Sequence, residues 1–392
     1  MKTIQRAFIL LVVAVCQPSV VLAQDDREAE ITEQHEFRND FRQVVEALNA
    51  GSFEPFLAAI DKKDMLDRIF GLRLIDQKVK KGFREDFENN LHSMVSAAIA
   101  HPDSATRAIL LDFDSRGDRG RAVVRFDLPE FQFNYHEYDL RRDKKGRLII
   151  VDWIDFLHGE QFSEDVGTSL VMLLPGKPAT RKLLDFQNVK ENELFKMTEL
   201  FKAARDRRAD KYFELVTEMD ERFQRQRIVV LTGVNLSKGV GNRRMLRMAL
   251  ISVAKYFPDE PLYSLMLLDY YFPAGRYEDA AQSLLRLQER LGVQEAAMQA
   301  RLSATALVMG NADDASAYAD TAIGLEPTLE LGWWSALRAR VALSQFDRSV
   351  EALQQLERQF GQSLGPEALK ADKSFGDLVA SEAYKGWLET RK

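Results

Sequence analysis

The sequence is poor in cysteine, because Cys16 is the single one among 392 residues. If the leading segment that contains Cys16 is removed, no thiol remains, which excludes disulfides, thiol nucleophiles and thiolate metal sites. Packing alone must then hold the fold. A chain of this length can bury a sizeable apolar core, and its length predicts two domains.

A strong charge of one sign is absent as well, and so are repeated long apolar runs. The net charge is −6, 46% of the residues are hydrophobic and 29% are charged. This composition excludes a disordered chain and a membrane protein with several spans. It also argues against a protein that binds nucleic acid over its whole surface.

Residues 1–23 have the pattern of a secretory signal peptide, which we expect to be cleaved after Ala23. A basic start leads into an apolar run at residues 7–16, and small residues stand before the cleavage point. The run is shorter than the about 20 residues of a transmembrane helix, and Pro18 stands close behind it. The alternatives are an uncleaved anchor and lipidation at Cys16, which the preceding valine disfavours. We therefore expect an exported protein of a bacterial periplasm or cell envelope, with no transmembrane span in the mature chain.

The C-terminal part of the chain repeats itself. Residues 260–361 have a period of 34 to 35 residues, and the three aligned segments are Gly275–Ala280, Gly310–Ala315 and Ser344–Ser349. In each segment a small residue breaks the chain, and the next helix is predicted to begin at Tyr277, Ala312 or Phe346. Such a period is typical of an array of helical hairpins, in which no unit buries its apolar face alone.

The small-x-aromatic-x-x-small core of these segments resembles the tetratricopeptide repeat family. Trp333 stands at the family's early aromatic position, and Pro327 closes the second repeat where the family closes. The resemblance implies an all-α solenoid that binds protein or peptide partners and rarely carries chemistry. Four helices, expected at residues 194–205, 210–223, 225–236 and 242–257, are predicted to form two degenerate hairpins. Residues 366–388 are predicted to form a capping helix pair, so the repeat domain covers residues 186–392.

Residues 24–185 are predicted to form a separate α+β domain. Helical spacing dominates up to Pro102, and residues 121–128 then alternate between apolar and polar side chains, which predicts a strand. Partner strands are expected at residues 108–113, 133–141 and 148–157. Helices followed by an antiparallel meander resemble nuclear-transport-factor-2-like (NTF2-like) or cystatin-like folds, in which a curved sheet wraps a helix. Prolines and glycine at residues 170–185 predict the domain boundary.

A wider resemblance covers most of the mature chain. Phe133–Glu137, the turn at Gly146, the apolar strand with Val151 and Asp152, and the repeats together resemble a group of uncharacterised exported bacterial repeat proteins. This resemblance implies a location in the cell envelope or periplasm and supplies no activity.

All five histidines precede residue 159. Acid/base chemistry that uses histidine is therefore expected only in the first domain. Asn134, His136 and Tyr138 alternate on one predicted strand face, and Asp152 lies on a neighbouring strand. A histidine and an aspartate that face one cavity would suit proton abstraction, as in isomerases and dehydratases that resemble this fold. The alternative is that His136 and Tyr138 are partly exposed and Asp152 pairs with an arginine. We expect no catalytic residue and treat these three as weak candidates.

Neither a metal nor a cofactor is expected. No two histidines stand three or four residues apart, as metal ligands on a helix would. Lys238 is followed by Gly239 and not by Ser or Thr, so the order required for a phosphate-binding P-loop fails.

Basic residues gather between residues 196 and 255, which hold fourteen Lys and Arg against seven Asp and Glu. The candidate basic patch comprises Arg205, Arg207, Arg208, Lys211, Arg243, Arg244 and Arg247. It could face an anionic partner, or it could be a solvated helix surface or one that docks the acidic first domain. No aromatic residues are interleaved as stacking platforms, so we expect no nucleic acid.

The groove of the solenoid is the preferred binding site. If the family's positions transfer one by one, it presents Leu262, Leu265, Asp269, Phe272, Ala297, Ala300, Ala304, Leu307, Leu331, Trp334, Arg338 and Val341. Repeat proteins that clamp an acidic chaperone tail carry Lys and Asn where this chain has mostly apolar residues. A groove with Trp334 and Arg338 as anchors fits a helix or a hydrophobic peptide. The alternative is that Trp334 packs against a neighbouring helix.

These observations leave three hypotheses for the function, and the oligomeric state is open in each. The first is a non-enzymatic exported scaffold or adaptor whose groove binds a protein or peptide in the cell envelope. The second is small-molecule binding, or isomerase- or dehydratase-like activity, in residues 36–170. The third is a structural frame in which the first domain packs into its own groove, which predicts that residues before 185 bury Trp334.

Overall fold

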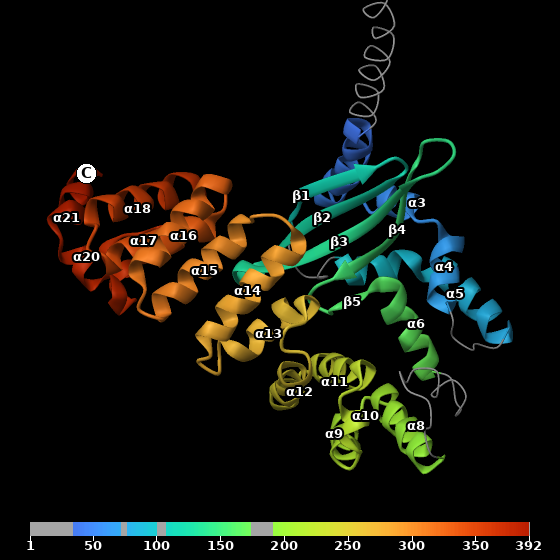
Figure 1. The fold of residues 1–392 in the computed structure, drawn as a ribbon. Coiled ribbons are helices and arrows are strands. Elements are labelled where there is room, and N and C mark those ends of the chain that lie inside the picture. The colour runs from blue at the N-terminus through green and yellow to red at the C-terminus, as the bar shows by residue number, and fades with distance from the viewer. Residues whose placement is uncertain (1–33, 72–76, 100–106, 174–190, 392) are drawn as a thin grey trace, which may run out of the picture.

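The computed structural model describes residues 34–71, 77–99, 107–173 and 191–391 (Figure 1). An antiparallel sheet lies between the helices of the first part of the chain and the helices of the repeats. Within the described ranges, no helix is long and apolar enough to cross a membrane. The predicted signal peptide at residues 1–23 lies outside these ranges.

The sheet is an antiparallel meander with its strands in sequence order. The strands are β1 (Arg107–Arg116), β2 (Arg119–Leu128), β3 (Gln132–Arg142), β4 (Leu148–Asp155) and β5 (Glu160–Gln161). Alternating side chains in β2 and β3 point to opposite faces, which is the pattern that predicted these strands. The turns that connect β1 to β2 and β3 to β4 contain Gly117 and Gly146, whose φ angles of 58° and 75° suit glycine.

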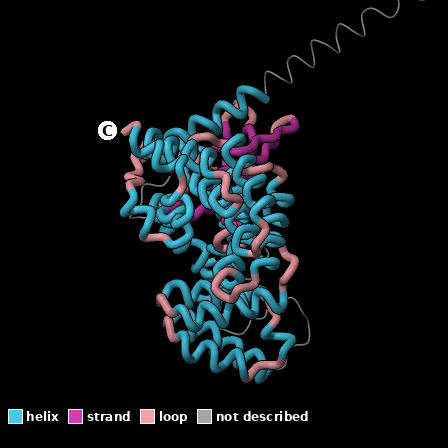
Figure 2. The backbone as a smooth tube through the Cα atoms, turned by 90° about the vertical axis from the view of Figure 1, so that its left-hand side faces the viewer, coloured by secondary structure: helices cyan, strands magenta, loops and turns pink. Residues whose placement is uncertain are grey.

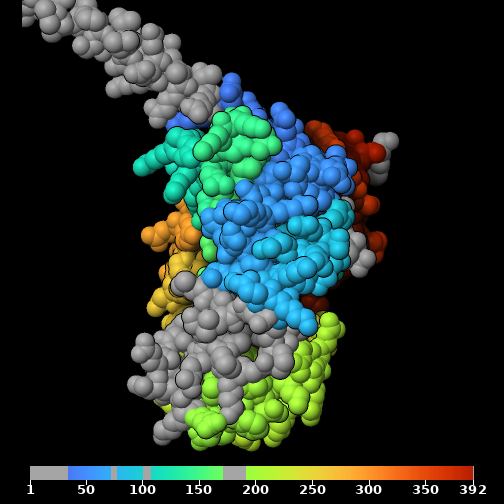
Figure 3. All heavy atoms as spheres, turned by 90° about the vertical axis from the view of Figure 1, so that its right-hand side faces the viewer, coloured from blue at the N-terminus to red at the C-terminus, as the bar shows by residue number. Residues whose placement is uncertain are grey.

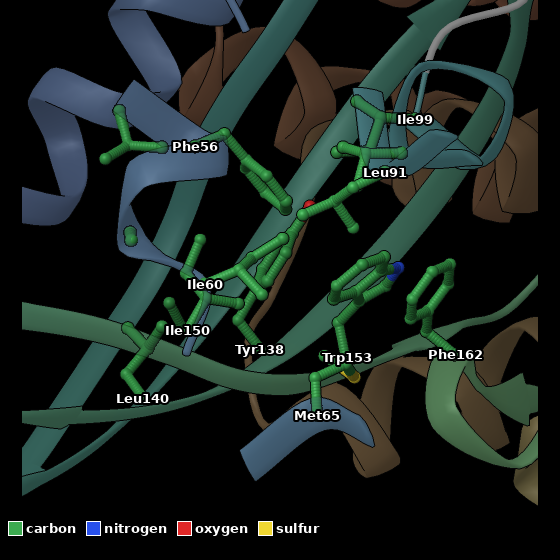
Figure 4. Packing of buried hydrophobic residues seen from close by; sticks show 14 of the residues in the cluster. Phe56, Ile60, Met65, Leu91, Ile99, Tyr138, Leu140, Ile150, Trp153 and Phe162 are labelled. Atoms are coloured by element: carbon green, nitrogen blue, oxygen red, sulfur yellow. The ribbon is translucent and has the colours of Figure 1, made fainter. Parts of the chain in front are cut away.

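The helices of the first part of the chain cover one face of the sheet. They comprise residues 34–49, α3 (Glu54–Ala59), α4 (Lys62–Phe70), α5 (Gln77–Ile99) and, after the sheet, α6 (Phe162–Leu173). Their apolar side chains meet Tyr138 and Trp153 of the sheet in one buried cluster (Figure 4). Phe56 contacts both rings edge-on, with ring centroids 5.9 Å from Tyr138 and 5.5 Å from Trp153. This cluster is the core of the first domain.

A β-bulge in β4 changes which of its side chains face the helices. The register between β3 and β4 shifts at Val151. Ile150 and Trp153 are three residues apart, and because of the bulge both face the helices. Asp152 falls on the opposite face.

Three helical hairpins form at the predicted repeats. They are α13 (Ser264–Tyr271) with α14 (Tyr277–Leu291), α15 (Ala296–Val308) with α16 (Ala312–Leu325), and α17 (Glu330–Ala342) with α18 (Phe346–Phe360). Each second helix begins at the residue that the period predicts. Two residues earlier the backbone is left-handed, with φ of 68° at Gly275, 85° at Gly310 and 57° at Ser344. A left-handed residue ends the preceding helix and reverses the chain.

Further helices extend the array on both sides. They are α8 (Glu191–Arg205), α9 (Ala209–Thr217), α10 (Glu221–Gln224), α11 (Arg227–Gly239) and α12 (Arg243–Tyr256) before the repeats, and α19 (Pro366–Lys370), α20 (Gly376–Ala380) and α21 (Glu382–Glu389) after them. Single 3-10 turns precede α13 (η2, Pro261–Tyr263) and α20 (η3, Lys373–Phe375). Leu378, Tyr384 and Trp387 of the last helices are buried in one cluster with α17 and α18. These helices therefore cover the last apolar face, which is the capping role predicted for them.

The second face of the sheet packs on the helical array. Val123, Phe133 and Tyr135 of the sheet share a buried cluster with apolar residues of α11 to α15. Figure 2, seen from the side of the repeats, shows helices in front of the strands. Figure 3, seen from the other side, shows the surface of the first helices, in blue and cyan, above the yellow-green helices α8 to α12. The sheet is thus buried on both faces and joins the two parts of the chain.

Three elements differ from the prediction. α6 is a helix in a segment for which the sequence suggested only an approaching boundary, and the boundary near residue 185 lies outside the described residues. α5 begins at Gln77, earlier than the helix expected over residues 87–100, because Val79 and Phe83 continue its apolar face toward the N-terminus. The helix predicted over residues 210–223 is split at Met219, which is buried between α9 and α10. The resemblance of the first domain to NTF2-like or cystatin-like folds stays a prediction.

Candidate functional site

His136 lies at the centre of a buried polar network on the helix-facing side of the sheet. Its Nδ1 is 3.0 Å from the Tyr138 hydroxyl, and its Nε2 is 3.1 Å from Asn134 Nδ2 and 3.6 Å from Asp155 Oδ2. The alternation along β3 thus brings the two candidates of that strand, His136 and Tyr138, onto one face together with Asn134. They are not partly exposed, because His136 has 0% and Tyr138 1% of its surface accessible. The Phe126 ring packs over the imidazole, with centroids 4.6 Å apart.

Asp155 is the carboxylate that meets His136. It accepts hydrogen bonds from Asn134 Nδ2 at 3.0 Å and from the backbone N–H of Leu157 at 2.8 Å, and its Oδ2 is 2.7 Å from His158 Nδ1. Burial disfavours its charge, but the imidazoles of His136 and His158 hold the pKa of Asp155 well below its usual range. The hydrogen bond to Asp155 in turn raises the pKa of His158.

Asp152 does not join this network. The bulge at Val151 turns its carboxylate to the other face, where it accepts hydrogen bonds from the Ser163 hydroxyl at 2.5 Å and from the backbone N–H of Trp153 at 2.9 Å. Burial raises the pKa of Asp152, although these hydrogen bonds favour its charged form. No arginine among the described residues forms an ion pair with it. Asp152 and His136 therefore do not face a common cavity.

Two cavities flank the end of the sheet. One, of about 300 Å³, lies between α5 and α6 and is lined by Trp153, Asp155, His158, Glu160 and Asp165 among others. The other, of about 330 Å³, lies between α6, α8 and α11 and shares Glu160 and Asp165 with the first. Burial and the nearby carboxylate of Asp165 raise the pKa of Glu160 to about 7. Neither cavity is lined by His136 or Tyr138.

The sheet covers the first part of the predicted groove. Leu265 and Ala297 are buried in the same cluster as Phe133 and Tyr135 of β3. The remaining groove positions fall into three groups. Ala300 and Val341 are buried; Leu262, Phe272, Leu307, Leu331 and Trp334 are half-buried; and Asp269, Ala304 and Arg338 are exposed. The first domain thus packs on the solenoid, but it does so at α13 to α15 and not at Trp334.

Glu295 is the residue that fastens the sheet to α15. It is the N-cap of this helix and accepts hydrogen bonds from the backbone N–H groups of Ala297 and Met298. Its other partners come from the sheet, because Tyr135 donates its hydroxyl at 2.7 Å and Arg125 forms an ion pair with it. Arg125 is fully buried and also bonds Asp127 at 2.6 Å and Glu326 at 2.8 Å.

A second set of ion pairs lies at the end of α14. Both guanidinium nitrogens of Arg290 bond the Glu137 carboxylate, at 2.6 and 2.8 Å. Arg121 bonds the same carboxylate at 2.8 Å and the backbone oxygen of Leu291 at 2.9 Å. The contact between sheet and solenoid is therefore built from paired charges around an apolar centre.

The groove beyond the sheet stays accessible. We call Ala304, Leu307, Trp334 and Arg338 the open groove segment. Its two helices are held together where the Ser335 hydroxyl donates to the backbone oxygen of Ala300 at 3.1 Å, one turn before the accessible residues. The Arg338 guanidinium lies over the Trp334 ring at 6.0 Å.

Trp334 belongs to the C-terminal part of the fold. Its ring packs against the cluster of α17, α18 and the capping helices, and its Nε1 donates to Glu330 at 3.0 Å. No described residue before 185 belongs to this cluster, so the described part of the first domain does not bury Trp334, contrary to the expectation of the structural-frame hypothesis. The adjacent Trp333 packs against the same cluster and donates to the backbone oxygen of Pro327 at 2.9 Å.

The predicted basic patch lies at helix ends. Six of its residues are exposed and Lys211 is half-buried. Arg205 and Arg207 line the 330 Å³ cavity, whereas Arg243, Arg244 and Arg247 do not. Arg205 pairs with Asp206 and Lys211 with Glu214, at 3.1 and 2.7 Å. Within the described residues, no cluster of histidine, cysteine or carboxylate side chains could hold a metal ion.

Several residues of these sites were not singled out from the sequence. Contacts between segments that are distant in the chain bury Arg125, Glu295, Asp155 and Glu160 and half-bury Asp165. A buried strand arginine such as Arg125 was the one available signal, because it must find a carboxylate. Its partner stands 170 positions later, and no spacing rule would have found it.

Comparisons with known proteins leave the family unassigned. No family model matches the chain, and no curated protein matches it. Two solved structures of MamA, from AMB-1 and MSR-1, are similar to 45% and 44% of this chain over 97% of their own, at 16% and 17% identity and TM-scores of 0.33 and 0.30. The Chs5–Chs6 exomer cargo adaptor complex bound to a portion of Chs3 is similar over 62% of this chain and 41% of its own, at 12% identity and a TM-score of 0.23.

Proposed function

We propose that this protein is a non-enzymatic, exported scaffold that binds a protein partner through the open groove segment. The partner segment we propose is a helix or peptide with an apolar side chain for Ala304, Leu307 and Trp334 and a carboxylate for Arg338. The observation that carries the proposal is the accessibility of Trp334 and Arg338 beyond the area that the sheet covers. Tryptophan and arginine are frequent binding hot spots, because they combine a large contact area with directed polar contacts.

The state of Arg338 supports an acidic group on the partner. Half of its side chain is exposed, and its ion pair with Asp372 is long, at 3.8 Å. Arg340 on the same helix differs, because it is buried and bonds Asp320 at 2.9 Å. Arg338 is therefore available to a partner, whereas Arg340 belongs to the packing of the solenoid.

The buried histidine network favours the scaffold over an enzyme of the first domain. The space next to His136 is filled by Phe126 and Tyr138, so a substrate has no access to the imidazole. A general base must come within hydrogen-bond distance of the proton that it removes. The contacts of His136 and Asp155 instead serve to hold the turn between β4 and β5.

Site-specific crosslinking tests the groove. With a photo-crosslinking amino acid at position 304, an exposed position of the open groove segment that leaves Trp334 and Arg338 in place, we expect one envelope protein to be captured and to bind the purified chain. Substituting Trp334→Ala and Arg338→Glu together should abolish that binding and leave the melting temperature nearly unchanged. Arg243→Glu is the matched control, because it makes the same charge change at an exposed arginine outside the groove. Equal binding by the groove variant and the control would refute the groove proposal.

Export is tested separately. Cell fractionation should place the protein in the periplasm or envelope, and sequencing of its N-terminus should begin at Gln24. An intact residue 1 in the cytoplasmic fraction would contradict export without affecting the groove.

A further inference from the structure

Trp153 combines complete burial with an unused hydrogen-bond donor. Only 1% of its surface is accessible, and its Nε1 has no hydrogen-bond partner within the described residues. Figure 4 shows the indole nitrogen at the end of the ring that lies toward Phe162. Trp153 and Phe162 both line the 300 Å³ cavity between α5 and α6. A buried donor without an acceptor costs free energy, so we expect the indole N–H to have an acceptor inside the cavity.

The same cavity has an aromatic wall. The rings of Trp153 and Phe162 stack with centroids 4.1 Å apart and planes inclined by 17°. Met94, Ala97 and Ala98 of α5 complete the apolar part of the lining. Such a surface receives a flat or aliphatic organic body, and aromatic faces attract cations.

Two carboxylates lie beside this wall, and few hydrogen bonds or ion pairs balance their charge. Asp165 makes no hydrogen bond or ion pair through its side chain with any residue in the described ranges, and it lines the cavity. Glu160 is 8% exposed, and its ion pair with Arg227 is long, at 3.9 Å. Burial raises the pKa of both carboxyl groups. Asp155, in contrast, is fully engaged by its histidines.

We propose that the cavity of Trp153, Phe162, Glu160 and Asp165 binds a small organic amine. The ammonium group lies against Asp165 and Glu160, the apolar body lies on the aromatic wall, and an oxygen or nitrogen of the ligand accepts the Trp153 Nε1–H. This site is separate from the open groove segment, so it goes beyond the proposed scaffold function and does not depend on it.

The pH dependence of binding follows from the carboxyl groups. Protonated carboxyls do not attract an ammonium, so the affinity should rise as the pH passes about 7, the raised pKa of Glu160. Burial raises the pKa of Asp165 as well, so its contribution changes with pH in the same direction. The other charged or titratable groups that face them are Asp155, His158, Glu164, Arg227 and Lys238. The hydrogen bond to Asp155 raises the pKa of His158, and loss of the imidazole charge with rising pH removes a competing cation, which acts in the same direction.

Calorimetric titration of the whole protein with tyramine and histamine tests the site. Each pairs an ammonium with an aromatic ring that carries an acceptor. We expect one molecule to bind per chain, with 4-ethylphenol and 4-hydroxyphenylacetate at least about tenfold weaker, because the first lacks the ammonium and the second carries the opposite charge.

Two variants locate the binding. Asp165→Asn and Glu160→Gln should each lower the affinity for tyramine by about tenfold or more, and Glu160→Gln should also flatten the rise with pH. Glu88→Gln is the matched control, because Glu88 is an exposed carboxylate of α5 that does not line the cavity. The proposal is overturned if neither amine binds, if the two compounds without an ammonium bind equally well, or if Glu88→Gln weakens binding as much as both cavity variants.

Discussion

Arg125 shows how much one buried charge can depend on the rest of the chain. Its guanidinium is inaccessible to water and is held by Asp127 of its own strand and by Glu295 and Glu326 of the repeats. A buried cation is tolerated only when carboxylates surround it. The ion pairs therefore fix how the sheet sits on the solenoid.

Replacing Arg125 with methionine should lower the free energy of unfolding by about 3 to 5 kcal/mol, because it leaves Glu295 buried without its cation. Urea denaturation measures the change. Arg338→Met, at an exposed arginine, should stay within about 0.5 kcal/mol of the parent protein. Adding Glu295→Gln to Arg125→Met should recover part of the loss. A double variant as unstable as the sum of the single ones would show that the pair does not interact in this way.

Because of Glu160, we expect the free energy of unfolding to fall as the pH rises. Burial raises its pKa in the folded protein from 4.5 to about 7. Between pH 4.5 and pH 7 the folded protein therefore binds a proton more tightly than the unfolded chain does. Its contribution is present below about pH 4.5 and is lost as the pH passes about 7. Relative to the parent protein, Glu160→Gln should gain up to about 3 kcal/mol of stability between pH 4.5 and 8. Urea denaturation at both pH values checks this, and a difference that does not change with pH would contradict it.

At the scale of elements, the bulge in β4 and the turn after it decide which side chains the first domain presents. The bulge sends Trp153 to the core and Asp152 away from His136. The turn after β4 brings Asp155 and His158 together and leads into β5. Two short irregularities thus place Trp153, Asp155 and His158 at the cavity, whereas Asp165 comes from α6.

Gly159 in that turn lies close to the solenoid. Its φ is 70°, and a Cβ atom there would come within 2.5 Å of the Tyr263 ring. Gly159→Ala should therefore destabilise the protein by about 2 kcal/mol or more, through both backbone strain and the clash. Gly117→Ala is the control, since its φ is 58° and its Cβ would meet nothing within 4 Å, so about 1 kcal/mol is expected. Equal thermal shifts for the two variants would show that Tyr263 moves aside freely.

At the scale of the whole molecule, the sheet belongs to two cores at once. One face carries the core of the first domain, and the other shares a cluster with α11 to α15. Removing the repeats would expose Val123, Phe133, Tyr135 and Phe156 to water. The two parts should therefore behave as one cooperative unit, although the sequence divides them.

Unfolding of the whole protein should follow a single transition, with near- and far-ultraviolet circular dichroism changing together. A fragment of residues 24–185 should bind a hydrophobic dye and self-associate, because an apolar sheet face of this size is uncovered. A monomeric fragment with the melting temperature of the full chain would show that the sheet does not need the repeats.

The sequence by itself determined the local architecture. The period around Tyr277, Ala312 and Phe346 set the starts of three helices, and alternation in β2 and β3 set the strands and their faces. These signals are local, because backbone geometry fixes which residues within a few positions share a face. Export and the partner stay predictions, since they concern residues 1–23 and a molecule outside the chain.

Only the tertiary structure decided which faces meet. The docking of the sheet on α13 to α15 covers part of the groove that the repeat pattern offered, and it leaves Trp334 and Arg338 accessible. Because of the bulge at Val151, Asp155 lies beside His136 where Asp152 had been expected. The physical reason is that the pairing of a buried charge or an apolar face depends on distance in space. No local sequence pattern identifies Glu295 as the partner of Arg125.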